Sequence, residues 1–134
     1  MVLVVKHILI KVSNLHVKIK HVFSISFIMY FSSAGMVSGD SVTPDKEEYT
    51  PTEGSSVTLN CTYETSSSNI YLYWYQQYPN QAPQFLLYKG ARSQSGSEHT
   101  RYTSTTSDTS TELIIQHLTL ADTALYYCAL DSTQ

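Results

Sequence analysis

Two cysteines and one tryptophan constrain the fold of this chain more than any other feature. Trp74, the only tryptophan, follows Cys61 by thirteen residues, and Cys128, the second and last cysteine, lies 67 positions after the first. In a two-sheet β-sandwich, one cysteine on each sheet lets a disulfide cross the roughly 10 Å between the layers. A large aromatic ring then covers the bridge, and Tyr126, two residues before Cys128, is placed for a tyrosine-corner hydrogen bond. The spacing therefore predicts a sandwich with a Cys61–Cys128 disulfide.

Apolar and polar residues alternate along much of the chain after Asp40, whereas no helical period lasts beyond a turn. Short alternating segments separated by polar, Gly- or Pro-containing turns predict an all-β domain of two antiparallel sheets. The predicted core includes Trp74, Leu113, Ile115 and Tyr126. Closing the loop between the two cysteines should stabilise so small a domain by about 4 kcal/mol.

The first 39 residues are predicted to be a secretory leader and not part of the fold. They contain four lysines and no acidic residue, and an apolar stretch at 22–31 follows a basic one. Residues 37–39 are small enough for a cleavage site before Asp40, and the apolar stretch is too short for a membrane span. Because 39 residues is long for a leader, we expect the first 15–20 to be an extension upstream of the true start codon. Entry into the secretory pathway would supply the oxidising compartment that a disulfide needs.

The predicted domain, residues 40–134, contains four basic and eleven acidic residues, a net charge of −7. Nucleic-acid binding needs a basic surface, so the charge argues against that function. Only six residues follow Cys128, too few for a further strand. We therefore expect the final strand of the sandwich to be missing and one sheet to end on an unpaired edge, which is an aggregation hazard.

Three motifs carry a family resemblance: Trp74-Tyr75-Gln76-Gln77 with Pro83, then Leu86-Leu87-Tyr88, then the string from Asp122 to Ala129. Across Asp40–Leu130 the chain resembles an immunoglobulin variable domain, and within that group a T-cell receptor alpha (or delta) variable segment. A complete domain of this family ends with a Phe-Gly-x-Gly strand supplied by a joining segment, and that string is absent here. The chain thus resembles a germline variable segment with its leader.

The resemblance implies three antigen-binding loops at one end of the sandwich. The residues expected in them are Ser66, Ser67, Ser68, Asn69, Ile70 and Tyr71 in the first, Lys89, Gly90, Ala91 and Arg92 in the second, and Ala129, Leu130 and Asp131 at the start of the third. Serine and asparagine side chains can form hydrogen bonds with varied partners, and tyrosine supplies a rigid aromatic contact area. Polar loops are, however, often merely solvated.

The resemblance also implies a chain-pairing surface and a structural ion pair. The residues expected to face a beta-type variable domain are Tyr75, Gln77, Pro83, Phe85 and Tyr127. An outward cluster of aromatic and amide side chains is typical of such an interface. Arg101 and Asp122 are expected to form an ion pair at the base of the sandwich, where it would serve the fold and not chemistry.

The function implied is that of the antigen-recognition variable region of a T-cell receptor alpha-type chain in adaptive immunity. Its partners would be a beta-type chain, a peptide held by a major histocompatibility molecule, and separate signalling subunits, at the outer face of the plasma membrane. The alternatives are a delta-chain or antibody light-chain variable segment, a variable-type adhesion or co-receptor domain, and a nonfunctional gene fragment.

Other signals favour neither an enzyme nor a cofactor or metal site. His99 and His117 have no ligand spacing and no partnered acid in the sequence, so solvated histidines are the better interpretation. The cysteines lack the short paired spacing of zinc sites, and no Gly-rich phosphate loop occurs. Asn60-Cys61-Thr62 is formally a glycosylation sequon, but its central cysteine is predicted to be in a disulfide.

Overall fold

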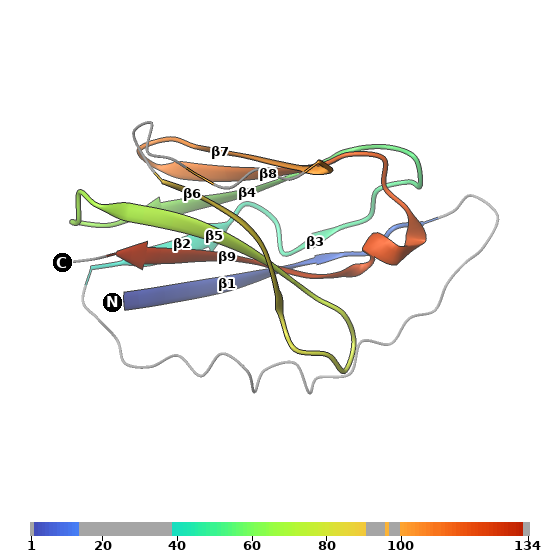
Figure 1. The fold of residues 1–134 in the computed structure, drawn as a ribbon, viewed down its shortest axis with the longest axis horizontal. Helices are drawn as coiled ribbons and strands as arrows, with labels where there is room; N and C mark the ends of the chain where they lie inside the picture. The colour runs from blue at the N-terminus through green and yellow to red at the C-terminus, as the bar shows by residue number, and fades with distance from the viewer. Residues whose placement is uncertain (1, 14–38, 91–95, 97–99, 133–134) are drawn as a thin grey trace.

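Two β-sheets pack face to face in the computed structural model, which describes residues 2–13, 39–90, 96 and 100–132 (Figure 1). The five-stranded sheet has the order β3 (Glu48–Tyr49), β1 (Val2–Ile10), β9 (Ala124–Ser132), β5 (Ile70–Gln77), β6 (Gln84–Gly90). The four-stranded sheet has the order β2 (Ser41–Pro44), β4 (Val57–Glu64), β8 (Ser110–Ile115), β7 (Tyr102–Thr106). A single-turn 3₁₀ helix, η2 (Leu120–Asp122), precedes β9. The all-β prediction is confirmed.

The core lies between the sheets, and β4, β7, β8 and most of β5 alternate buried and more accessible residues, whereas every residue of β9 is buried. Along β4 every second residue from Val57 to Tyr63 is buried, and the residues between them are exposed or half-buried. The large side chains Trp74, Leu113, Ile115 and Tyr126 are all 0% exposed. A period of two is what a sheet with one face on the core requires.

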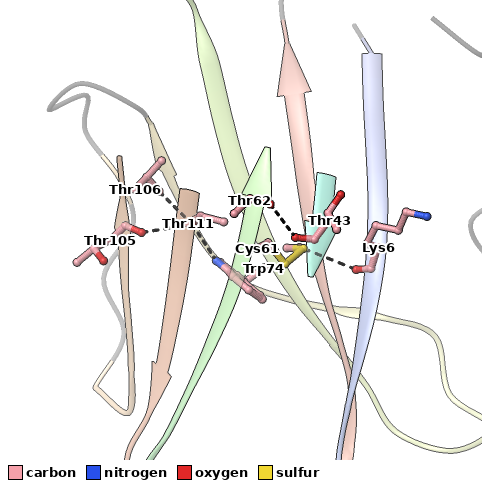
Figure 2. The surroundings of a disulfide bond; sticks show 9 residues. Lys6, Thr43, Cys61, Thr62, Trp74, Thr105, Thr106 and Thr111 are labelled. Carbon is pink, nitrogen blue, oxygen red and sulfur yellow. Dashed lines mark hydrogen bonds between the residues drawn. A yellow bond between two sulfur atoms is a disulfide. The ribbon is translucent and has the colours of Figure 1, made fainter. Parts of the chain in front are cut away.

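A disulfide joins the two layers through this core. Cys61 on β4 is bonded to Cys128 on β9, and their Cα atoms are 6.7 Å apart, which confirms the predicted pairing. Trp74 lies beside the bridge on β5, and its indole Nε1–H donates to Thr111 Oγ1 on the opposite sheet at 3.4 Å (Figure 2). Thr111 Oγ1 is in turn 3.1 Å from Thr106 Oγ1. The tryptophan therefore covers the disulfide and satisfies its own polar atom.

The edge of β9 that was expected to be unpaired is covered by β1, so that expectation is wrong. β1 runs antiparallel to β9, from Val2 opposite Ser132 to Ile10 opposite Ala124. On its other side β1 pairs in parallel with β3. In Figure 1 the two strands lie side by side, with β1 next to the final strand. The position of the expected missing strand is filled by the opposite end of the chain.

Residues expected to lie outside the fold thus contribute to it. Ile8 and Ile10 are 0% exposed and Val12 is 5% exposed. Their period of two and their β-branched side chains suit a strand that packs on a core. The apolar stretch 22–31 and most of the predicted cleavage site lie outside the described residues, so the leader stays a prediction. Within the described part of the chain no helix is long and apolar enough to span a bilayer.

Candidate binding surfaces

An aromatic cluster covers the outer face of β5 and β6. We call Tyr73, Tyr75, Phe85 and Tyr88 the aromatic surface. The ring centroids of Tyr75 and Phe85 are 5.9 Å apart, and those of Tyr73 and Tyr88 are 5.6 Å apart. Phe85 is 51% exposed, and among the described residues it is the large hydrophobic side chain that stands open to solvent. Rings packed at these distances form a continuous apolar face over β5 and β6.

Strand register explains why these four rings meet. Tyr73 lies directly opposite Tyr88, and Tyr75 lies opposite Phe85. The register of the β5–β6 pair shifts between Trp74 and Tyr75. Cross-strand neighbours on one face are close enough for aromatic contact. The shift brings Phe85 opposite Tyr75, so the two successive aromatic pairs share one face.

Two of the three tyrosines of β5, Tyr73 and Tyr75, have a pKa raised above that of a free phenol. Burial is the main cause that raises the pKa of Tyr73, and the nearby carboxylate of Asp131 adds to it. Burial and Asp131 likewise raise the pKa of Tyr75. A neutral phenol costs less to bury against another protein than a charged phenolate does. The aromatic surface is therefore suited to a largely apolar contact with hydroxyl groups at its edge.

The other residues expected at the pairing surface are less accessible. Gln77 is 1% exposed and Tyr127 is 6% exposed. The Tyr127 hydroxyl donates to Gln77 Oε1, and Gln77 Nε2 donates to Gln81 O at 2.8 Å. Pro83 and Tyr75 are half-buried. Gln77 and Tyr127 are therefore buried and bonded to each other, while Phe85 is the most exposed of the five predicted pairing residues.

Tyr73 and Tyr88 belong to the surface, although they were not among the predicted pairing residues. The signal for Tyr73 was present, since Tyr71, Tyr73 and Tyr75 alternate on one face of a predicted strand. Tyr88 could be assigned only from the register between β5 and β6, which the sequence alone does not fix.

The predicted first binding loop connects β4 to β5 at the end of the sandwich where β9 terminates (Figure 1). Ser66, Ser68 and Asn69 are exposed. The Ser67 N–H donates to Thr65 Oγ1 at 3.1 Å, so a local side-chain bond shapes the turn. Ile70 and Tyr71, expected in this loop, are instead the first residues of β5, and Ile70 is 4% exposed. Ile70 therefore packs in the core.

Several residues expected in the second and third loops lie in strands instead. Lys89 and Gly90 are the last residues of β6, opposite Leu72 and Tyr71. Ala91 and Arg92 lie outside the described residues. Ala129, Leu130 and Asp131 all belong to β9, and none is more than 9% exposed. The reason is that β9 pairs with β1 on one side and β5 on the other as far as Ser132.

At the opposite end of the sandwich, Arg101 and Asp122 form a two-point ion pair. Arg101 Nη2 is 2.7 Å from Asp122 Oδ2, and Nη1 is 3.2 Å from Oδ1. The Asp122 side chain is 3% exposed and also accepts a bond from the Thr119 N–H at 2.8 Å. Its backbone carbonyl accepts the Tyr126 hydroxyl at 2.9 Å, the tyrosine-corner bond. These bonds tie η2 to β9 and to the start of β7.

The described residues hold no group of three or more His, Cys, Asp or Glu arranged to bind a metal ion. His117 is exposed, with a positive φ of 51° in the turn after β8, and His99 lies outside the described residues.

Comparison with known proteins agrees with this geometry. The model of the immunoglobulin V-set domain matches residues 45–134. T cell receptor alpha variable 18 of Homo sapiens is 41% identical over 93 residues, which cover 69% of this chain and 83% of the relative. The T-cell receptor alpha chain V region RL-5 of Oryctolagus cuniculus is 38% identical over 109 residues, 80% of each chain. T cell receptor alpha variable 38-2/delta variable 8 of Homo sapiens is 34% identical over 110 residues, 81% of this chain and 90% of the relative. The chain belongs to the immunoglobulin V-set family and, within it, to the T-cell receptor alpha variable regions.

Proposed function

We propose that this chain is the alpha-type half of a receptor that recognises peptide held by a major histocompatibility molecule. It pairs through its aromatic surface with a beta-type variable domain, and its loop end contacts the antigen. Recognition is noncatalytic, and separate signalling subunits transmit the result. The domain lies on the extracellular side of the plasma membrane in the complete receptor, after entry through the secretory pathway.

The exposure of Phe85 is the observation that carries the pairing proposal. A phenylalanine that is 51% exposed in the centre of a four-ring cluster leaves apolar area in water. Covering such area against a partner is favourable by about 25 cal/mol per Å² before the costs of association. Aromatic anchors near the middle of an interface usually dominate its affinity. Phe85 fits that description better than Gln77 or Tyr127, which are buried already.

The loop proposal is supported by the exposed polar side chains between β4 and β5. Ser66, Ser68 and Asn69 project from a turn held by the Thr65 side chain. Such residues form hydrogen bonds to varied partners at little entropic cost when the turn is already ordered. A role in a delta-type receptor chain is a second candidate, because the name of one relative contains both alpha variable and delta variable.

A pairing measurement tests the proposal. The chain is mixed with a beta-type variable domain, and the dissociation constant is measured by analytical ultracentrifugation. We expect a 1:1 complex that Phe85→Ser weakens at least about 10-fold. Thr103→Ser, an exposed position on β7 of the other sheet, is the matched control and should leave the affinity unchanged. Absence of a complex, or equal affinities for the two variants, would contradict the pairing proposal.

A further inference from the structure

The sequon Asn60-Cys61-Thr62 lies on β4 with its asparagine on the face opposite the disulfide. Burial alternates along this strand: Cys61 is 0% exposed in the core, whereas Asn60 is half-buried and Thr62 is exposed. Successive side chains of a strand point to opposite faces of its sheet. The disulfide from Cys61 to Cys128 and a group attached to Asn60 therefore occupy opposite sides of β4, so both fit in one molecule.

The neighbours of Asn60 leave room for a large substituent on the outer face of the sheet. The edge strand β2 ends at Pro44, opposite Cys61, so its ladder stops one residue short of Asn60. On the other side of β4, Glu112 of β8 lies opposite Asn60. The Glu112 carboxylate accepts a hydrogen bond from Thr105 Oγ1 of β7 at 3.5 Å. Because β7 lies beyond β8, the Glu112 side chain extends away from Asn60.

The amide oxygen of Asn60 is unsatisfied. Oδ1 is buried without a hydrogen-bond partner in the described part of the chain, an arrangement that costs free energy. The amide nitrogen Nδ2, to which an N-glycan is joined, is not among the buried atoms that lack a partner. Asn60-Cys61-Thr62 is also the single Asn-x-Ser/Thr sequence of the chain. Modification of Nδ2 therefore explains an asparagine at this position better than a structural bond of Oδ1 does.

The order of synthesis removes the conflict between the sequon and the disulfide. Cys128 follows Cys61 by 67 residues. Because chains grow at about 5–20 residues per second, the second cysteine is made roughly 3–13 s after the first. During that interval Cys61 cannot form the disulfide, and β4 cannot pair with β8, which also lies downstream. A transferase that acts on the growing chain therefore meets Asn60 before the disulfide exists.

We propose that Asn60 carries an N-linked oligosaccharide on the outer face of the four-stranded sheet. The co-substrate is an oligosaccharide joined to a lipid diphosphate. Asn60 Nδ2 forms a bond to the anomeric carbon of the sugar and gives up one proton, while the bond from that carbon to the diphosphate oxygen breaks and the lipid diphosphate leaves. Because the aromatic surface belongs to the other sheet, the glycan leaves it uncovered. The proposal needs entry into the secretory pathway but neither chain pairing nor antigen binding.

Translation of the full chain in the presence of microsomes tests the proposal. A fraction of the unsubstituted chain should migrate more slowly on a gel. Peptide-N-glycosidase F in heavy-oxygen water should reverse the shift and leave a labelled aspartate at position 60, identified by mass spectrometry. Thr62→Ala should abolish the shift, because it removes the hydroxyl residue of the sequon. Thr58→Ala, at another exposed threonine on the same face of β4, is the matched control and should leave the shift unchanged.

A second sequon separates failure of the site from failure of entry. Asp108→Asn in the Thr62→Ala chain creates one with Thr109 and Ser110, in the turn between β7 and β8. Modification there, without modification of Asn60 in the unsubstituted chain, would overturn the proposal at the site itself. Modification at neither position would overturn it at the entry step.

The state of the cysteines tests the argument from synthesis order. Cys128→Ser should leave the glycosylated fraction unchanged, since transfer precedes the disulfide. Free-thiol labelling should find Cys61 blocked by the disulfide in the glycosylated, unsubstituted chain. A glycan confined to molecules in which Cys61 is a free thiol would show that the two modifications exclude each other, and it would overturn the proposal for the folded domain.

Discussion

The Arg101–Asp122 pair should stabilise the fold far more than the Lys11–Glu48 pair, although both have short N–O distances of 2.7 and 2.9 Å. The difference lies in burial. Asp122 is 3% exposed, so its carboxylate without Arg101 would be an uncompensated buried charge. Hydrogen bonding to Asp122 also raises the pKa of Arg101, which keeps that partner charged. Lys11 and Glu48 are 44% and 48% exposed, so water replaces their contact.

The free-energy cost expected for breaking each ion pair depends on how deeply its side chains are buried. Breaking a buried pair costs about 3–5 kcal/mol. Since the Arg101 side chain is itself 37% exposed, we expect the lower end, about 3 kcal/mol, for Arg101→Ala. A double-mutant cycle with Asp122→Ala should give a coupling energy of about 2 kcal/mol. The same cycle with Lys11→Ala and Glu48→Ala should give less than about 1 kcal/mol.

Urea unfolding at pH 7 with the disulfide intact measures both cycles, with Trp74 fluorescence as the signal. Raising the salt concentration from about 0.05 to 1 M should remove most of the Lys11–Glu48 coupling and leave most of the Arg101–Asp122 coupling. Equal coupling energies for the two pairs, or loss of both in salt, would refute the reasoning from burial.

Three further outcomes are expected. Replacing Cys61 and Cys128 by Ala should lower the free energy of unfolding by about 4 kcal/mol, measured by urea unfolding. An unchanged urea midpoint would contradict a stabilising role for the disulfide. Tyr126→Phe should cost about 1–2 kcal/mol, because Gln76 and the Asp122 carbonyl lose a buried partner. Burial raises the pKa of Tyr126 above its usual 10, so the neutral phenol is favoured in the folded state. Its contribution is complete below pH 10 and is lost as the pH rises above that, so thermal unfolding of Tyr126→Phe should depend less steeply on alkaline pH than that of the unsubstituted chain. Phe85→Ser should lower the stability of the isolated chain by about 1 kcal/mol in the same urea assay, since the half-exposed ring packs against Tyr73, Tyr75 and Tyr88.

The sandwich could be predicted because its main determinants are visible in the sequence as characteristic residue spacings and as local alternation of apolar and polar residues. Cys61, Trp74 and Cys128 mark positions on two sheets, and alternation of period two marks the strand faces between them. The structure adds the hydrogen bond from Trp74 to Thr111, which no spacing indicates because it depends on the packing of one sheet on the other.

The placement of residues 2–10 could not be predicted in the same way. A basic, apolar N-terminal segment has the composition of a leader. A short apolar run of this kind is, however, equally compatible with a buried strand. The choice depends on pairing with β9, more than a hundred residues away in the sequence. β9 pairs as far as Ser132 with both β1 and β5, which is why Ala129–Asp131 lie in a strand and not in a loop. Tyr88 was missed for a related reason, since its contact with Tyr73 depends on register.

The central claim, that this chain is the antigen-recognition region of an alpha-type receptor, is tested most directly in lymphocyte transcripts. Amplification forward from the codons for Trp74–Gln77 gives the sequence downstream of Cys128 in each transcript. The account predicts many different junctions leading into a Phe-Gly-x-Gly strand and one alpha-type constant region. A single invariant continuation in every transcript would contradict it and favour a fixed adhesion-type domain.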